Sequence, residues 1–260
     1  FAFTGNKFEF RMVGSSDSVA PPNVVLNTIV AEAFKEAADQ LEQAEDFDSA
    51  VHDMIKSLLA AHRRIIFNGN GYSDAWVKEA EARKLPNIRS MVDAIPALTT
   101  EKAIKLYETF GVFTRAELMS RAEIEYDAYG KVINIEARTM IDMAGKQIIP
   151  AVIKYTTQLA GSINAVKAAC PDGLADISAQ TQLLKETSAL LAKMKEALSA
   201  LEELTAKCGA IQDACARAHG YHDQVVPAME ALRAPADRLE MIVDKELWPF
   251  PSYGDLIFEV

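Results

Sequence analysis

The chain has 260 residues, of which 50% are hydrophobic and 25% are charged, and this balance is typical of a soluble globular protein. No stretch reaches the roughly 20 apolar residues that a membrane span requires, and no signal-like leader is evident. The formal net charge of −10 argues against nucleic acid as a partner, because its phosphates attract basic surfaces. Small anionic substrates are compatible with this charge, since local cations can bind them. Because the chain opens at Phe1, we expect a piece of a longer polypeptide.

The first predicted element is a strand over residues 7–12, where charged and apolar side chains alternate. Lys7, Glu9 and Arg11 would share one face of this strand, with apolar side chains behind them. A carboxylate held between two cations can ligate a hard divalent metal while its neighbours bind phosphate or carboxylate oxygens. The alternative interpretation is a solvated strand face, on which alternating charges are common.

Two helices are predicted next. Residues 22–44 begin with a proline, which suits the first turn of a helix, and the sequence becomes acidic towards the end of this segment. Ser49 is expected to cap a second helix that ends near Ala61. Residues 65–67 are then expected to form a short extended piece.

The two Asn-Gly pairs of residues 68–71 predict a turn, because both residue types accept a positive φ. Ser73 or Asp74 is expected to cap the helix that follows. An alternative is that these glycines cradle a phosphate. They lack the spacing and the lysine of a P-loop, so the turn is the favoured interpretation.

The longest helical pattern begins at Thr114 and continues towards Leu159, with apolar residues recurring every three or four positions. We expect a bend at Pro150, because proline lacks a donor and its ring clashes with the preceding turn. Polar residues interrupt the apolar pattern at 134–138. They are expected to form an intrahelical polar edge, and the alternative is that some of them are paired inside a bundle.

The chain must reverse direction at residues 170–173, which contain a proline and a glycine. The next helix then carries an aliphatic residue at every seventh position, with two more on the adjoining seam: Ile177, Leu184, Leu191 and Leu198, then Met194 and Leu201. This spacing predicts coiled-coil-like packing against a neighbouring helix. Long apolar stripes joined by short turns predict a mainly α fold, an antiparallel helical bundle with a small β remnant at its N-terminus.

The remaining candidate groups are cysteines and histidines. Cys208 and Cys215 would lie two helical turns apart, roughly 10 Å, which is too far for a disulfide. We expect all three cysteines, including Cys170, to be reduced, in a cytoplasmic protein. Cys208 and Cys215 are expected to be small buried hydrophobes. His219 and His222 have the spacing of a metal pair, but the lack of a nearby carboxylate array favours a helix surface or cap.

Residues 247–260 differ from the rest in being aromatic and punctuated by prolines, with little helical character. Free in water, this tail would expose on the order of several hundred Å² of apolar surface, which soluble proteins rarely tolerate. We therefore expect the tail to dock, either on its own bundle or on another subunit.

Several segments together resemble one enzyme family. The strand at residues 7–12 is followed by Gly14-Ser15-Ser16-Asp17 and Pro21-Pro22-Asn23, and the other resembling segments are residues 65–73, 134–137, 227–237 and 246–251. Their order resembles glutamine synthetase, in particular the long type III enzymes. The resemblance implies the C-terminal edge of the catalytic domain over residues 1–46, a helical C-terminal region over 47–245 and an aromatic docking tail over 246–260.

The resemblance implies an ATP-dependent glutamate–ammonia ligase that makes glutamine through a γ-glutamyl phosphate. By position, Glu9 matches the family's metal-ligating glutamate on the nucleotide side, and Arg11 matches the arginine that contacts the substrate or its developing phosphate. Lys7 stands where many relatives have a nucleotide-contacting arginine. The implied cofactors are ATP and Mg²⁺ or Mn²⁺, held mainly by parts of the parent enzyme outside this chain. We therefore expect the isolated fragment to be inactive.

The resemblance also implies glutamate and ammonia as substrates, and self-association into rings that form a dodecamer in the parent enzyme. The alternative function is a non-catalytic helical module for interaction or oligomerisation. A signalling coil would fit residues 177–201 but neither the strand nor the aromatic tail. Neither nucleic acid nor a membrane is expected as a partner.

Overall fold

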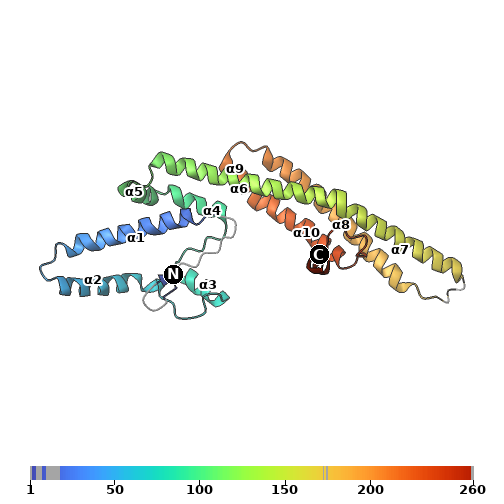
Figure 1. Cartoon of the computed structure of the whole chain (residues 1–260), viewed down its shortest axis with the longest axis horizontal. Helices are drawn as coiled ribbons and strands as arrows, with labels where there is room; N and C mark the ends of the chain where they lie inside the picture. Colours follow the sequence, from blue (N-terminus) through green and yellow to red (C-terminus); the bar gives the residue numbers. More distant parts are fainter. Residues whose placement is uncertain (1, 4–7, 10–17, 172, 174, 259–260) are drawn as a thin grey trace. The chain divides into compact units, whose positions relative to one another are not determined.

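The computed structural model describes residues 2–3, 8–9, 18–171, 173 and 175–258, and residues 2–3 and 8–9 only in their backbone. The chain divides into two compact units, Phe1–Ser120 and Arg121–Val260. Helices make up most of both units, which confirms the predicted mainly α fold (Figure 1). Among the described residues, no helix is both long and apolar enough to cross a membrane.

The N-terminal unit begins with two short antiparallel strands, β1 (Ala2–Phe3) and β2 (Phe8–Glu9). Ala2 lies opposite Glu9, and Phe3 lies opposite Phe8. The strand β2 falls within the segment predicted as a strand, and the other positions of that segment lie outside the described residues. That these strands belong to the edge of a catalytic domain stays a prediction.

Two long helices follow, side by side (Figure 1), and they confirm the predicted pair. The first, α1 (Ala20–Leu41), has proline in its first turn. The second, α2 (Phe47–His62), is capped by Asp46 and not, as the sequence suggested, by Ser49. The Asp46 carboxylate accepts hydrogen bonds from the Ser49 amide at 3.3 Å and hydroxyl at 2.7 Å. A carboxylate is the stronger acceptor at a helix start, and these bonds hold its pKa below its ordinary value.

The expected extended piece begins one residue late, because Ile65 still belongs to the 3₁₀ turn η1 (Arg63–Ile65) and the extended backbone starts at Ile66. The predicted turn then leads into α3 (Asp74–Ala82), which Ser73 caps by accepting from the Trp76 amide. The Asn70 side chain accepts from the Tyr72 amide at 3.0 Å, which closes the turn.

The rest of the N-terminal unit packs short helices on the start of a long one. These are α4 (Met91–Ala94), the 3₁₀ turn η2 (Ile95–Thr99), α5 (Glu101–Thr109) and the first residues of α6 (Arg115–Met143). Their core consists of Ile104, Tyr107 and Leu118. Thr114 and Glu117 form a reciprocal capping box, in which the Glu117 carboxylate accepts from the Thr114 amide at 2.8 Å and the Thr114 hydroxyl accepts from the Glu117 amide at 3.3 Å.

In the C-terminal unit, the long predicted helix is interrupted by a wide π turn, η3 (Ala144–Ile148), before α7 (Ile149–Ala169). This turn is the irregularity expected at Pro150, placed just upstream of it. A proline cannot donate to the carbonyl four residues earlier and its ring would clash there, and a wider turn relieves both problems. A second π turn, η4 (Tyr221–Val225), precedes Pro227 in the same way. Each turn ends with Gln and an aliphatic residue, and a second aliphatic residue, Pro and Ala follow.

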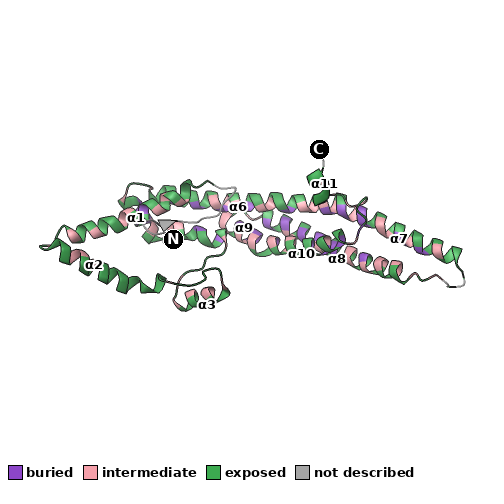
Figure 2. Cartoon of the chain, turned by 60° about the horizontal axis from the view of Figure 1, so that its bottom comes forward, coloured by how far each residue is buried: buried purple, intermediate pink, exposed green. Residues whose placement is uncertain are grey.

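After the expected reversal, α8 (Ser178–Gly209) returns along α7, and α9 (Ala214–Gly220), η4 and α10 (Val226–Glu240) complete an antiparallel bundle (Figure 1). Buried residues gather where α6, α8 and α10 face one another (Figure 2). On the predicted heptad seam, Met194, Leu198 and Leu201 are buried, while the earlier positions are only partly covered. Arg238 near the end of α10 pairs with Glu186, so the first turns of α8 extend beyond α10.

The aromatic tail docks in part on its own bundle. Leu247, Trp248 and Phe250 pack against the buried core, and the two aromatic rings meet edge to face at 6.1 Å. The prediction that the tail has little helical character is wrong at its end, where α11 (Tyr253–Phe258) forms. Ser252 and Asp255 make a capping box at its start, which supplies the helix signal.

Candidate functional site

Of the three candidate site residues on the predicted catalytic strand, one lies in the described backbone. Glu9 lies in β2, while Lys7 and Arg11 lie outside the described residues, so the proximity of these three side chains stays a prediction. Elsewhere in the described part of the chain, no group of three or more His, Cys, Asp or Glu residues could hold a metal ion.

The histidine pair is arranged as a helix surface, as expected. His219 lies in the last turn of α9 with its ring 6.3 Å from that of Tyr126. His222 lies in η4, beside the Tyr129 ring, and its Nδ1 is 2.7 Å from a carboxylate oxygen of Asp223. The two rings thus each pack beside a tyrosine of α6. All three cysteines are free thiols. Cys208 is fully buried, which confirms its predicted role as a small hydrophobe, whereas Cys215 is only partly buried.

The Asn-Gly loop supports an aromatic cluster, which favours the turn interpretation over a phosphate cradle. The Phe67 and Trp76 rings stack at 4.0 Å, and the Arg83 guanidinium lies within 6 Å of both ring centres. Arg83 also donates to the carbonyls of Arg64 at 3.2 Å and Ile66 at 2.8 Å. A Cβ at Gly69 would come within 2.6 Å of the Phe67 ring, so a larger residue there would displace this ring.

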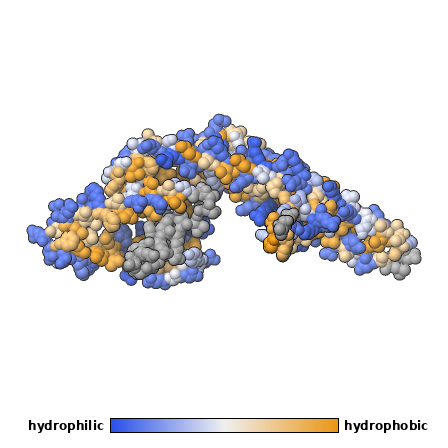
Figure 3. Space-filling model, in the orientation of Figure 1, coloured by the Kyte–Doolittle hydropathy of each residue, from blue (hydrophilic) through white to orange (hydrophobic). Residues whose placement is uncertain are grey.

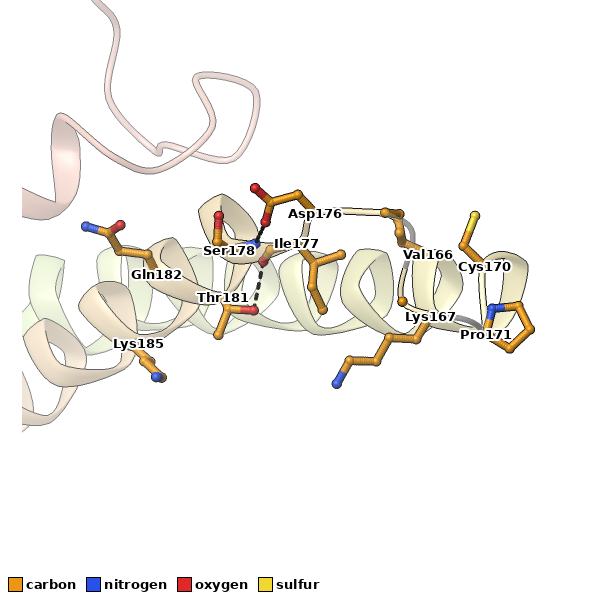
Figure 4. Close-up of a pocket in the computed structure, with 12 residues that line it drawn as sticks. Val166, Lys167, Cys170, Pro171, Asp176, Ile177, Ser178, Thr181, Gln182 and Lys185 are labelled. Atoms are coloured by element: carbon orange, nitrogen blue, oxygen red, sulfur yellow. Dashed lines mark hydrogen bonds between the residues drawn. The ribbon is translucent and has the colours of Figure 1, made fainter.

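A cavity of about 990 Å³ lies at the tip of the α7–α8 hairpin (Figure 4). Two of its polar side chains bond within the start of α8: Asp176 accepts from the Ser178 amide at 2.8 Å, and the Thr181 hydroxyl donates to the Ile177 carbonyl at 2.9 Å. These bonds organise a helix start, and the labelled side chains around them do not converge on a common point in Figure 4.

A second cavity, of about 540 Å³, lies within the C-terminal unit between α6, the end of α8 and α9. Its charged residues are one carboxylate and three cations: Asp127, Lys131, Arg138 and Arg217. We call this space the polar cavity. Asp127 pairs with Lys131 at 2.6 Å and with Arg217 at 2.8 Å. These cations, Lys131 foremost, hold the pKa of Asp127 below its ordinary value.

Arg217 is fixed at the wall of the polar cavity by several acceptors. Besides Asp127, it donates to the carbonyls of Ile211 at 2.8 Å and Gln212 at 3.1 Å, which belong to the connection between α8 and α9. Arg138, by contrast, donates through Nε to the Asn134 side chain at 3.1 Å. This intrahelical bond confirms the predicted polar edge on α6.

The polar cavity was not predicted from the sequence. Asp127 and Lys131 have the i,i+4 spacing of a helical ion pair, a signal that was available. Arg217 comes from 90 residues later in the chain, and Thr205 and Tyr221 from two other elements, so no local pattern joins them.

Comparisons with known proteins identify the chain's relatives. Residues 50–167 match the glutamine synthetase C-terminal domain. The chain is 34% identical over 263 residues to the type-3 glutamine synthetase of Dictyostelium discoideum, with 99% of the chain covered. It is 35% identical to a glutamine synthetase of Butyrivibrio fibrisolvens, with 100% covered, and 31% identical to one of Bacteroides fragilis, with 99% covered. The chain belongs to the glutamine synthetase family.

The family predicted from the sequence is thereby confirmed, including its likeness to a type-3 enzyme. The chain spans 36–37% of the length of these relatives. Within the family, the C-terminal domain match covers α2 through most of α7 and therefore includes the α6 wall of the polar cavity.

Proposed function

We propose that this chain is the C-terminal part of an ATP-dependent glutamate–ammonia ligase. The observation that carries the proposal is similarity to glutamine synthetases over 99–100% of the chain. In the reaction, a carboxylate oxygen of glutamate forms a bond to the γ-phosphorus of ATP and ADP leaves. Ammonia then attacks the acyl carbon, phosphate leaves, and the nitrogen loses a proton to give glutamine.

Within this proposal, the residues of the N-terminal strand bind the reacting groups. Glu9 is an anionic oxygen ligand for Mg²⁺ or Mn²⁺, Arg11 contacts the substrate or its developing phosphate, and Lys7 places a point charge near the nucleotide. A bound divalent metal offsets the charge of the transferring phosphoryl group. One glutamate does not suffice for a metal that takes about six oxygen ligands. The other ligands would come from the remainder of the ligase.

Exposed apolar side chains of the N-terminal unit support its place in a longer chain. They gather on α1 and α2, where hydrophobic residues are prominent in Figure 3, and include Ile29, Val30, Phe34, Ile55, Leu58 and Leu59. Phe34 is 72% exposed and Leu59 is 56% exposed. Monomers rarely expose contiguous apolar patches of this kind. We propose that the catalytic portion, which makes up the other two-thirds of the relatives' length, covers these exposed side chains of α1 and α2.

Two measurements test this proposal. Mass spectrometry of the polypeptide from its native source should give a mass well above 28.5 kDa. A coupled assay should detect glutamine synthesis with that polypeptide, in a cytoplasmic extract, and none with the 260-residue chain alone. A native polypeptide of 28.5 kDa, or activity of the isolated chain, would contradict the proposal.

A non-catalytic module for interaction or oligomerisation is the second candidate function, favoured by the exposed face of α11. Tyr253 is 85% exposed and Phe258 is 81% exposed, although the residues before them are docked. For the parent ligase we propose self-association into rings, in a dodecamer. The coupled assay distinguishes the two ideas, because light scattering would show assembly in both cases, whereas a module without ligase activity would fail the assay.

A further inference from the structure

We propose that the polar cavity between α6, α8 and α9 binds a small anion that carries a carboxylate or phosphate group. The cavity belongs entirely to the C-terminal unit and contains none of the residues assigned to the ligase reaction. The inference therefore goes beyond the proposed function and stands independently of it.

The charge of the cavity favours an anion. The lining contains three cations, Lys131, Arg138 and Arg217, and one carboxylate, that of Asp127, so it carries a formal charge of about +2 in a chain whose net charge is −10. Asp127 is already engaged by Lys131 and Arg217. Arg138 has no ion pair among the described residues and uses only Nε, towards Asn134. The rest of its planar guanidinium can take a carboxylate or phosphate through two parallel hydrogen bonds.

A buried hydroxyl in the same lining lacks a partner. Thr205 is 5% exposed, and its Oγ1 makes no hydrogen bond. Thr28, Thr139 and Thr157 return this bond to the carbonyl four residues earlier, at 2.7, 2.9 and 2.8 Å, whereas Thr187 also lacks a partner. A buried hydroxyl without a partner is unfavourable, and because Thr205 belongs to the cavity lining, we propose that an acceptor oxygen of the ligand becomes its partner.

Glycines keep the cavity open beside a buried tyrosine. A Cβ at Gly209 would lie 3.3 Å from the Tyr221 hydroxyl, and a Cβ at Gly130 would lie 3.6 Å from the Tyr221 ring and 3.8 Å from Arg217 Nε. Burial raises the pKa of Tyr221, with a further rise from Cys208, while the guanidiniums of Arg138 and Arg217 oppose this rise. The phenol therefore keeps its proton at neutral pH and is available as a donor to an anion.

The size of the cavity restricts the ligand to small molecules. About 540 Å³ lies within the range of roughly 300–1,000 Å³ that small-molecule sites occupy. Nucleic acid and acidic polypeptides would need a much longer basic surface, which a chain of net charge −10 does not favour.

Calorimetric titration of the full chain with inorganic phosphate and, separately, with succinate tests the proposal. We expect saturable binding of one equivalent of at least one of the two, weakened by added salt because the contacts are ionic. Phosphate binding without succinate binding would identify phosphate esters as the ligand class, and the reverse would identify carboxylates. The absence of saturable heat with both anions would overturn the proposal.

Two variants and a control locate the binding. Arg138→Gln keeps a polar side chain beside Asn134 and should weaken binding at least tenfold, and the isosteric Thr205→Val should weaken it at least threefold. Lys154→Gln removes an exposed cation on α7, outside the cavity lining, and should leave binding within twofold. Circular dichroism checks that each variant is folded. Binding that is unchanged in both cavity variants, or lowered equally by Lys154→Gln, would show that the anion interacts elsewhere.

Discussion

The guanidinium of Arg217 lies 2.8 Å from the carboxylate of Asp127, which precedes it by 90 residues. This contact ties α9 to α6, while two further bonds from Arg217 hold the connection that leads from α8 into α9. One side chain, 21% exposed, thus fixes three segments around the polar cavity. The ion pair is therefore part of the architecture of the C-terminal unit and not only a surface charge pair.

Replacing Arg217 should destabilise the C-terminal unit. Arg217→Gln removes charged hydrogen bonds to two carbonyls and a carboxylate, so we expect a loss of about 1–3 kcal/mol in the free energy of unfolding. Urea denaturation followed by circular dichroism measures it. Arg233→Gln is the matched control, since Arg233 forms an exposed i,i+4 pair with Asp237 and should change stability by under about 0.5 kcal/mol. Equal effects of the two substitutions would contradict this role of Arg217.

The docked part of the tail should matter more than its exposed end. Trp248→Ala removes a ring that packs on the core, and we expect it to cost about 3 kcal/mol. Trp248→Phe should cost much less, because the indole Nε1 is buried without a partner and its loss removes that penalty. Tyr253→Ser, at an exposed position, should be nearly neutral. Guanidinium unfolding curves give all three values, and a larger effect at Tyr253 than at Trp248 would be inconsistent with the docking described.

A second buried hydroxyl offers a stabilising substitution. Thr187 is fully buried in α8 and its Oγ1 has no partner, so the isosteric Thr187→Val should raise the free energy of unfolding by about 1 kcal/mol. Thr181→Val on the same helix is the control, because the Thr181 hydroxyl donates to the Ile177 carbonyl and its removal brings no such gain. Thermal unfolding compares the two variants. A lower midpoint for Thr187→Val than for Thr181→Val would rule out this explanation.

The attachment of α11 should depend on pH. The Lys245 ammonium, and then the Ser252 hydroxyl and amide, lower the pKa of Asp255 from 3.8 to about 2. A carboxylate whose folded pKa is depressed stabilises the folded form above its unfolded pKa, and this contribution is lost as the pH falls from about 4 to about 2. Hydrogen exchange of residues 253–258, corrected for intrinsic rates, should therefore accelerate in that window. In Asp255→Asn the exchange should be fast already at pH 5, and slow exchange there would count against the ion pair.

Local patterns in the sequence predicted the helices and several of their ends. Apolar spacing located α6 through α8, and Ser73 was one of the two residues expected to cap α3, because its hydroxyl acts within one turn. Pro150 indicated an irregularity, but the same proline is compatible with a kink or with the π turn that occurs, so spacing alone did not decide between them. Asp46 and not Ser49 caps α2, because the cap is the side chain that reaches the free amides at the helix start. Which side chain reaches them depends on local geometry.

The features that could not be predicted from the sequence depend on contacts between residues that are far apart in the chain. The pairing of Asp127 with Arg217 and the burial of Thr205 arise only when α6, α8 and α9 meet, and neither leaves a periodic signal. The first half of the tail docks and the second half stays exposed, although both halves contain aromatic residues. This difference arises because only the first half reaches the core. The predicted strand site depends on side chains beyond those described, and its assignment stays with the family resemblance.

Steady-state kinetics of a Glu9→Gln variant of the full-length ligase tests the central claim most directly. Glutamine would keep the shape of the side chain and remove an anionic metal ligand, so we expect a loss of about 3–4 kcal/mol of transition-state stabilisation, several hundredfold in kcat/KM. Glu202→Gln, an exposed position on α8, should leave the rate unchanged. A Glu9→Gln enzyme within about threefold of the wild type, a difference of less than 1 kcal/mol, would contradict the account and show that the strand is structural.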